Sequence, residues 1–563
     1  MYSLLEIKNL HIDFAQDNTT VPAVKNISFN LTKGKITAIV GESGSGKSVT
    51  ALSILQLLPK AAVITGEIGF SEDGTSQVPL NAIAGKAIEQ IRGNKISMIF
   101  QEPMTSLNPV YTCGEQVMEC LLRHKKISKK AARQQTIKLF EQVELPDAAG
   151  MLNRYPHEIS GGQKQRVMIA MAMSCEPDIL IADEPTTALD VRVQKNILQL
   201  IKELQQQNNM SVMLITHDLG LVADVADEII VMYKGGIVEQ GHSKDILSNP
   251  SHAYTKALLA CRPKPGSKGK KLVVLKDALA SNEISVEEKT NNRPGIKTGS
   301  VVLSVKDLQV YIPASKNIFG KPTAYIKAVD AVSFDVKQNE IVGLVGESGC
   351  GKTTLGRAIL QLIKPTTGRI VLNGKDISSM PEAELRKERK DLQIVFQDPY
   401  GSLNPRINIG TAIMEALKVH HMHGNDKGRK DAVINMLEKV QLQPDHFKRY
   451  PHQFSGGQRQ RICIARALVL DPSFLIFDES VSALDVSVQA EILNLINELK
   501  AAMAFTSIFI SHDLSVVHYI SDRILVMNKG KIIEEGTADE IYFDPKMEYT
   551  QQLIEAIPGR QLI

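Results

Sequence analysis

Two glycine-rich segments of this chain have the residue types and the spacing that hold phosphate groups. Residues 41–48 read G-E-S-G-S-G-K-S, and residues 346–353 read G-E-S-G-C-G-K-T. In this pattern the glycines let backbone N–H groups converge on an anion at a helix N-terminus, and the lysine reaches the terminal phosphates. The sequence therefore predicts two nucleotide sites on one polypeptide. Their predicted binding residues are Gly41, Ser43, Gly44, Gly46, Lys47 and Ser48, and then Gly346, Ser348, Gly349, Gly351, Lys352 and Thr353.

An acidic pair follows a strongly apolar segment in each half of the chain. In the first half, Asp183 and Glu184 follow residues 179–182. A carboxylate at the end of a buried strand is costly unless it holds a cation, so Asp183 is predicted to position Mg²⁺ together with the Ser48 hydroxyl. Glu184 is predicted to orient or deprotonate the attacking water, a contribution of about 10²–10⁴-fold. The matching residues of the second half, with the same predicted roles, are Thr353, Asp478 and Glu479.

Two further pieces recur in both halves. Ser160 opens the run S-G-G-Q before a predicted amphipathic helix at 165–174, which would place its hydroxyl and the Gly162 amide where a γ-phosphate could sit. His217 follows a predicted strand at 212–216 and is predicted to contact the same phosphate. The matching residues of the second half are Ser455, Gly457 and His512.

The matching motifs occur in the same order and at one constant separation from Ser160 and Ser455 onward. That separation is far longer than the ~20–50-residue period of solenoid repeats, so a duplicated domain is predicted. Strands that alternate with helices predict a mainly parallel sheet with its ligands at the carboxyl ends of the strands. The predicted fold is therefore α/β, with two P-loop NTPase domains in tandem, each carrying an α-helical subdomain (residues 101–160 and 397–455).

A change of composition divides the two halves. Between residues 262 and 300 Lys, Pro, Gly, Asn and Ser dominate, and only residues 272–275 could anchor a core. We therefore predict domains at residues 1–262 and 301–563, joined by a flexible linker at 263–300.

Composition and charge exclude several classes. The 65 basic and 62 acidic residues nearly balance, which gives no reason to expect a nucleic-acid partner. We expect no membrane-spanning helix, because no apolar run approaches the required ~18–20 residues, and no export signal, because the N-terminus lacks a charged segment followed by an apolar one. The six cysteines form no zinc spacing. These features predict a cytosolic protein.

One cysteine invites a chemical prediction. Cys350 lies in the second glycine-rich loop, two residues before Lys352 and next to a predicted helix N-terminus. A nearby cation and a helix N-terminus both stabilise a thiolate. We therefore expect a lowered pKa for Cys350, and inhibition by maleimides against which Mg-ATP protects.

The combined motifs resemble the nucleotide-binding domains of the ABC transporter superfamily over both halves, apart from residues 263–300. The resemblance implies that Gln101 and Gln397 contact ATP and Mg²⁺, and that Phe14 stacks on adenine. It also implies that the two halves dock head to tail, so that the signature serine of each half faces the ATP bound by the other. In the second half Ile312 stands at the position of Phe14, and the neighbouring Tyr311 would point to the other face of its strand.

A narrower resemblance is to the oligopeptide/dipeptide/nickel importer branch, including its fused glutathione- or microcin-type members. It is carried by residues 101–109 and 397–405, and by the tails N-P-S-H-A-Y-T at 249–255 and D-P-K-M-E-Y-T at 544–550. It implies an ATP-hydrolysing subunit on the cytoplasmic side of the inner membrane. Two permease subunits would be its partners, and an extracytoplasmic solute-binding protein would act indirectly. Cys261 stands alone in its tail, so no iron–sulfur centre is expected.

Two alternatives remain open at this point. A soluble ribosome-associated translation factor with two fused ABC domains would need a long, charged, helical arm between them, whereas residues 263–300 are rich in Pro, Gly and Asn. An ABC exporter ATPase is the other alternative, because the direction of transport rests on the branch resemblance alone.

Overall fold

The computed structural model describes residues 2–16, 19–101, 106–187, 189–281, 300–316 and 322–559. The chain forms two compact units, which we call the first half (residues up to Leu259) and the second half (Ala260–Ile557). Residues 102–105 of the branch motif and residues 282–299 of the predicted linker lie outside the described residues.

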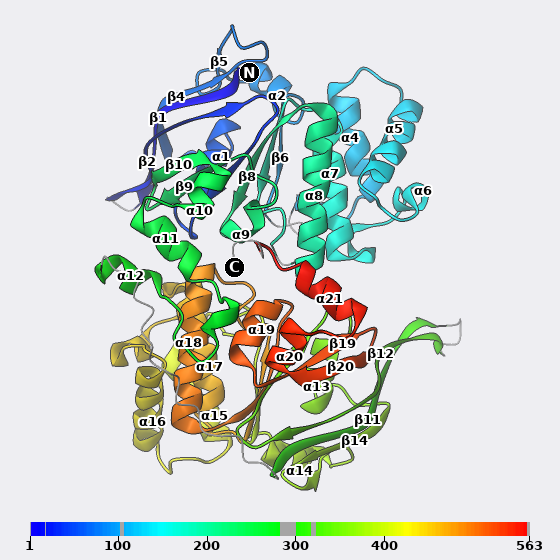
Figure 1. Cartoon of the computed structure of the whole chain (residues 1–563), viewed down its shortest axis with the longest axis vertical. Helices are drawn as coiled ribbons and strands as arrows, with labels where there is room; N and C mark the ends of the chain where they lie inside the picture. Colours follow the sequence, from blue (N-terminus) through cyan, green and yellow to red (C-terminus); the bar gives the residue numbers. More distant parts are fainter. Residues whose placement is uncertain are drawn as a thin grey trace. The chain divides into compact units, whose positions relative to one another are not determined.

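The first half contains two sheets (Figure 1). A four-stranded antiparallel sheet has the order β2-β1-β4-β5, and a six-stranded sheet has the order β10-β9-β3-β8-β7-β6, with only β10 antiparallel to its neighbour. Every residue of the central strands β3 and β7 is buried, as expected for parallel strands covered on both faces. The strands are β1 Ser3–Gln16, β2 Thr19–Thr32, β3 Ile36–Val40, β4 Ala62–Phe70, β5 Val78–Pro79, β6 Ile96–Ile99, β7 Ile179–Asp183, β8 Ser211–Thr216, β9 Glu228–Tyr233 and β10 Gly236–His242.

The helices of the first half fall into two groups. Helices α4, α5 and α6 pack with α7 as the helical subdomain, and α1 joins the core formed by both sheets (Figure 1). The helices are α1 Lys47–Ile54, α2 Lys86–Ile91, α4 Cys113–His124, α5 Lys129–Gln142, α6 Ala148–Met151, α7 Gly161–Met173, α8 Val191–Asn208, α9 Leu219–Val222, α10 Ser243–Ser248 and α11 Ala253–Ala260.

The second half repeats this plan. Its sheets have the orders β12-β11-β14-β15 and β16-β17-β18-β13-β19-β20, and α15 and α16 pack with α17 as its helical subdomain. The strands are β11 Val301–Lys316, β12 Pro322–Lys337, β13 Ile341–Val345, β14 Thr367–Leu372, β15 Lys375–Asp376, β16 Leu392–Val395, β17 Phe474–Asp478, β18 Thr506–Ile510, β19 Arg523–Asn528 and β20 Lys531–Thr537. The helices are α12 Leu275–Ser281, α13 Lys352–Ile359, α14 Glu382–Glu388, α15 Ile409–Val419, α16 Asp426–Lys439, α17 Gly456–Leu468, α18 Val486–Met503, α19 Leu514–Ile520, α20 Ala538–Phe543 and α21 Glu548–Glu555.

The predicted α/β fold with two tandem domains and two helical subdomains is confirmed. The main differences are at helix starts. Helix α7 begins at Gly161 rather than at residue 165, because Ser160 and Gln163 form a reciprocal capping box. Helix α1 begins at Lys47, directly after Gly46 with φ 99°, and Gln56 with φ 50° follows its end. Among the described residues, every helix is too short or too polar to span a lipid bilayer.

Residues 268–278, which we call the strap, are seated on the second half. Leu272, Leu275 and Ala278 are buried. The Leu272 N–H donates to Asn494 Oδ1 and the Leu272 carbonyl accepts from Asn494 Nδ2, both at 2.9 Å. The Tyr519 hydroxyl donates to the Lys270 carbonyl at 2.8 Å. The strap is thus a part of the predicted flexible linker that is bound to the second half. The predicted domain limits stay a prediction.

Candidate active site

The lysine of each glycine-rich loop is buried beneath its own loop. Lys47 Nζ donates to the carbonyls of Gly41 at 2.7 Å and Glu42 at 2.8 Å. Lys352 Nζ donates to the carbonyls of Gly346 at 2.8 Å and Glu347 at 3.0 Å. Both lysines begin a helix whose first N–H groups have no partner inside the helix, which is the geometry that accepts an anion.

A hydroxyl–carboxylate pair lies beside each lysine. The Ser48 hydroxyl donates to Asp183 Oδ1 at 3.0 Å, and the Thr353 hydroxyl donates to Asp478 Oδ1 at the same distance. Burial raises the pKa of Asp183 to about 6, and it also raises the pKa of Asp478. A buried carboxylate against a hydroxyl is a donor set that suits a hard cation.

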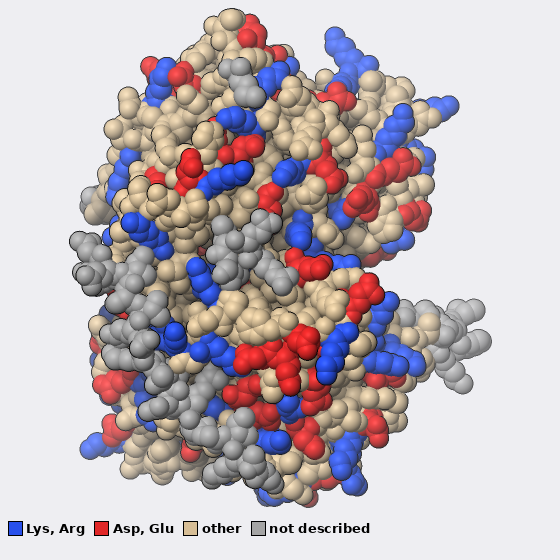
Figure 2. All heavy atoms as spheres, viewed as in Figure 1, with Lys and Arg blue, Asp and Glu red and all other residues tan. Residues whose placement is uncertain are grey.

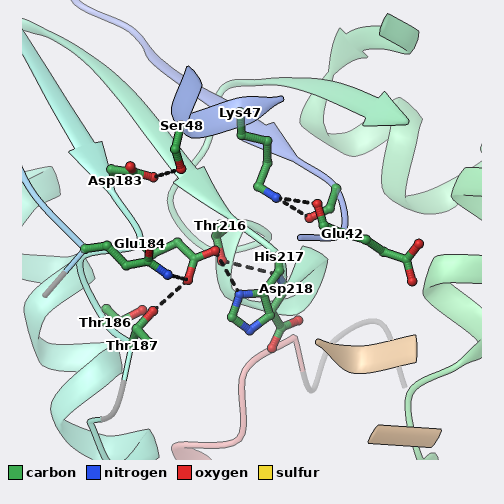
Figure 3. A network of polar contacts seen from close by, with 12 residues as sticks. Glu42, Lys47, Ser48, Asp183, Glu184, Thr186, Thr187, Thr216, His217 and Asp218 are labelled. Carbon is green, nitrogen blue, oxygen red and sulfur yellow. Dashed lines mark hydrogen bonds and ion pairs between the residues drawn. The ribbon is translucent and has the colours of Figure 1, made fainter. Parts of the chain in front are cut away.

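Glu184 is the centre of the polar network in Figure 3. Its carboxylate accepts from Gln101 Nε2 at 3.1 Å and from the Thr187 hydroxyl at 2.9 Å, and it lies 3.3 Å from His217 Nδ1. Burial alone would raise the pKa of Glu184, but the hydrogen bond and the charge of His217 outweigh it and lower the pKa to about 2. This carboxylate is therefore ionised at neutral pH.

The second half repeats this network with one change. Glu479 accepts from Gln397 Nε2 at 2.9 Å and lies 3.6 Å from His512 Nδ1. Its pKa is lowered as well, because the contacts with His512 outweigh the effect of burial. Ser482, at the position of Thr187, donates to the backbone carbonyl of Glu479 instead of to its carboxylate.

Both glutamates adopt a left-handed backbone conformation that is unusual for residues with a side chain. Their φ angles are 47° for Glu184 and 48° for Glu479. The N–H of Glu184 donates to Ile215 and that of Glu479 to Ile510, at 2.9 and 3.0 Å, which ties each glutamate to the strand that ends beside its histidine. Strain of this kind persists only where the surrounding structure enforces it, and it concentrates at functional sites.

The structure brings together some of the predicted residues and not others. Lysine, hydroxyl, aspartate, glutamine, glutamate and histidine meet in each half. Ser160 and Ser455 are exposed at the N-termini of α7 and α17, and among the described residues their hydroxyls bond only within their own capping boxes. Phe14 is half-buried in β1, whereas Ile312 is exposed in β11. Tyr311 is turned away from Ile312, and its hydroxyl donates to Asp330 at 2.8 Å.

The prediction of a lowered pKa for Cys350 is wrong, while its reaction with maleimides stays untested. The residue is only 7% exposed, and burial raises the pKa of its thiol despite the nearby positive charge of Lys352. The sequence showed the lysine and the helix N-terminus, but it could not show that the thiol points into the protein.

Sequence reasoning missed the contacts made by three residues of the site. Thr187 bonds to Glu184, and it is close enough in sequence that its hydroxyl was a usable signal. Tyr254 and Tyr549 contact the glycine-rich loops from about 200 residues away in sequence, with separations of 212 and 202 residues. Their only signal was the repetition of tyrosine in the two tails.

The fold and the paired networks define a P-loop ATPase with two matching domains. A family model described as "ABC transporter" matches residues 24–187 and 329–482, and one described as "Oligopeptide/dipeptide transporter, C-terminal region" matches residues 238–288. The chain belongs to the ABC transporter family, as an ATP-hydrolysing subunit.

Curated relatives match over nearly the whole chain. Glutathione import ATP-binding protein GsiA of Salmonella typhimurium is 45% identical over 558 residues, which are 99% of this chain and 89% of the relative. The proteins of the same name from Pectobacterium atrosepticum and Shigella sonnei are 44% and 46% identical, covering 99% of this chain and 89% and 90% of their own.

Solved structures of single cassettes also match. The dimeric bacterial ABC transporter cassette MJ0796 is 28% identical with a TM-score of 0.38, covering 42% of this chain and 98% of its own. The cassette cbiO1 of Clostridium perfringens is 27% identical with the same TM-score, covering 44% of this chain and 92% of its own.

Proposed function

We propose that this chain energises the import of a small peptide or a related solute, and that both of its ATP sites hydrolyse ATP. The observation that carries the proposal is the duplication of the complete network. Glu184 and Glu479 each meet a glutamine and a histidine, and each hydroxyl–carboxylate pair has the same 3.0 Å distance. Each half has the lysine, the hydroxyl–carboxylate pair, the glutamine, the glutamate and the histidine, although Ser482 of the second half does not bond to the Glu479 carboxylate as Thr187 does to Glu184.

The metal in this proposal is Mg²⁺, held by Ser48 and Asp183 in one site and by Thr353 and Asp478 in the other. Gln101 and Gln397 would complete the two sets. The fit rests on the buried carboxylates, whose oxygens already meet a hydroxyl. When bound, Mg²⁺ would neutralise charge on the terminal phosphates. No cluster of three or more His, Cys, Asp or Glu in the described part of the chain competes for a metal.

The protein's own groups then do the following work. Lys47 and Lys352 bind the terminal phosphates, and the amides of each glycine-rich loop surround them. Glu184 and Glu479, ionised at neutral pH, orient the attacking water and accept its proton. His217 and His512 hold these carboxylates in place and face the γ-phosphate.

We propose that the halves pair head to tail, so that Ser160 and Gly162 face the ATP bound by the second half. Ser455 and Gly457 would face the ATP of the first half. The support is that both serines are exposed at helix N-termini, where free N–H groups favour an anion. Phe14 would stack on adenine in the first site. The proposed domain limits are 1–262 and 301–563.

The proposed partners are two permease subunits that place the chain on the cytoplasmic face of the membrane. An extracytoplasmic binding protein would deliver the cargo. Because the relatives are named as glutathione import proteins, glutathione is the first cargo to test. The nearly neutral charge gives no support for a nucleic-acid partner.

The test is reconstitution. The chain should co-purify with two permeases and, in vesicles, its ATPase rate should rise when a peptide-loaded binding protein is present. Gln101→Ala and Gln397→Ala should reduce transport more than ATP binding. Co-sedimentation with ribosomes without permease binding would replace the proposal with the translation-factor alternative, and outward movement of cargo would replace it with the exporter.

A further inference from the structure

One tyrosine from the tail of each half contacts the glycine-rich loop of the same half. Tyr254 of α11 is fully buried, and its hydroxyl oxygen accepts from the N–H of Glu42 at 3.0 Å. Tyr549 of α21 accepts from the N–H of Glu347 at the same distance. Each contact joins residues more than 200 positions apart, so it depends on the tertiary structure. The same contact occurs in both halves.

The loop residue that meets the tyrosine also meets the phosphate-binding lysine. Lys47 Nζ donates to the carbonyl of Glu42 at 2.8 Å, and Lys352 Nζ donates to that of Glu347 at 3.0 Å. The tyrosine thus holds one side of this residue while the lysine uses the other. Holding this N–H therefore holds the loop backbone, which positions both the lysine and the backbone amides that would bind phosphate.

In the first half, a carboxylate anchors the N-terminus of the tail helix. Glu239 of β10 accepts from the Ser251 N–H at 2.6 Å, from the Ser251 hydroxyl at 2.8 Å and from the His252 N–H at 3.2 Å. A carboxylate at a helix N-terminus is stabilising, since it satisfies N–H groups that lack partners inside the helix. Tyr254 is consequently presented to the loop from a fixed helix.

Glu534 of β20 plays the same part in the second half. It accepts from the N–H of Lys546 at 2.7 Å and of Met547 at 3.3 Å, and from the hydroxyl of Thr550. Figure 2 shows acidic side chains gathered over β20 and α20, elements that include Glu534, Glu535, Asp539 and Glu540. The contacts of Glu534 identify it as an anchor for helix α21.

The two tyrosines differ in their surroundings. The ring of Tyr254 stacks on Tyr233 with centroids 4.3 Å apart, and Tyr233 is the last residue of β9. The last residue of the matching strand β19 is Asn528, which has no ring. Removing the hydroxyl should therefore disturb the second loop more than the first.

We propose that Tyr254 and Tyr549 are positioning residues for ATP binding, each holding the backbone of a glycine-rich loop from a tail helix. The proposal rests on the proposed function of these loops as ATP sites. A loop that is already fixed loses less freedom when it binds phosphate, so its affinity is higher. The proposed role of the tyrosines gives a function at the ATP site to the region matched at residues 238–288, which contains Glu239 and Tyr254.

The test uses the full chain with Tyr254→Phe, Tyr549→Phe or both. Each variant should raise KM for ATP, about tenfold for Tyr549→Phe and less for Tyr254→Phe, with kcat unchanged. Tyr519→Phe is the matched control, because it removes another buried hydroxyl that bonds to a backbone carbonyl, on the strap. The control should lower Tm and leave KM unchanged.

An unchanged KM in the double variant, or an equal rise in Tyr519→Phe, would overturn the proposal. Equilibrium binding of a fluorescent ATP analogue distinguishes the role of the tyrosines from the proposed function. If the wild-type chain binds ATP without hydrolysing it, the proposed hydrolysis is wrong. The affinities of the variants for the analogue still test the role of the tyrosines. If a tyrosine variant does not fold, Glu239→Gln and Glu534→Gln decide, because loosening the helix anchors must weaken ATP binding and an unchanged affinity would refute the role.

Discussion

The two halves share the polar contacts of their proposed ATP sites, but they differ in an ion pair at the start of two neighbouring strands, β3 and β9 in the first half and β13 and β19 in the second. In the first half Lys35 pairs with Glu228, and each side chain is about a quarter exposed. In the second half the charges are exchanged: Glu340 is buried and Arg523 binds it through two nitrogens, at 2.8 and 3.3 Å. The difference teaches that the chemistry depends on a few atoms at strand ends, while the supporting charges can be rearranged.

The largest expected effect tests whether the two sites contribute alike. Glu184→Gln or Glu479→Gln removes a base that typically contributes about 10²–10⁴-fold, so either change should reduce ATPase activity severely. Steady-state phosphate release measures this. The double variant should hold a closed, ATP-bound state. Near wild-type turnover in Glu479→Gln would show that only the first site matters.

The exchanged ion pair should give unequal stabilities. Arg523→Gln leaves Glu340 buried without its cation, which costs about 3–5 kcal/mol in the free energy of unfolding. Lys35→Gln in the first half should cost about 0–1 kcal/mol, because that pair is partly exposed to water. Denaturant unfolding of the full chain measures both. Equal losses would mean that burial of Glu340 is unimportant.

The strap should stabilise only the second half. Asn494→Leu leaves the N–H and the carbonyl of Leu272 without their partner, and each unsatisfied buried group costs about 1–3 kcal/mol. The matched control is Gln199→Leu at the corresponding exposed position of α8, which should stay within about 0.5 kcal/mol of wild type. Thermal unfolding followed by limited proteolysis locates the loss, and a loss in the first half would contradict the assignment.

The smallest expected effect concerns the loops themselves. Cys350 corresponds to Ser45 of the first loop, and Cys350→Ser should leave the ATPase rate close to wild type. Because burial raises the pKa of Cys350, its thiol stays protonated at neutral pH and gains thiolate only as the pH rises. N-ethylmaleimide should therefore label it slowly at pH 7 and faster above pH 9. Rapid labelling at pH 7 would restore the original prediction.

Much of the site could be predicted because its chemistry is local in the sequence. The loop pattern identified Lys47, and a carboxylate after an apolar strand identified Asp183, whose oxygen indeed meets the Ser48 hydroxyl. Parallel strands bring their carboxyl ends to one edge, so the acidic pair and the histidine were expected at that edge. The fold followed from the same alternation of strands and helices.

What the sequence could not predict depends on side-chain direction and on distant contacts. The burial of Cys350 raises its pKa and Lys352 lowers it, and only the three-dimensional structure shows that burial has the larger effect. The hydroxyl of Tyr254 reaches the loop across 212 residues. In the strap, Leu272 was recognised as apolar, but the sequence around its polar partner Asn494 does not indicate that this asparagine binds another segment of the chain.

The strap precedes every strand of the second half in the chain, and yet the second half holds it in place. A polypeptide cut after residue 300 would leave residues 268–278 on the first fragment and their seat, around Asn494 and Tyr519, on the second. The first fragment would then carry a peptide that recognises the second. In the intact chain the covalent connection keeps that peptide at a high effective concentration, on the order of mM for short linkers. The covalent link thus keeps the strap bound to the second half.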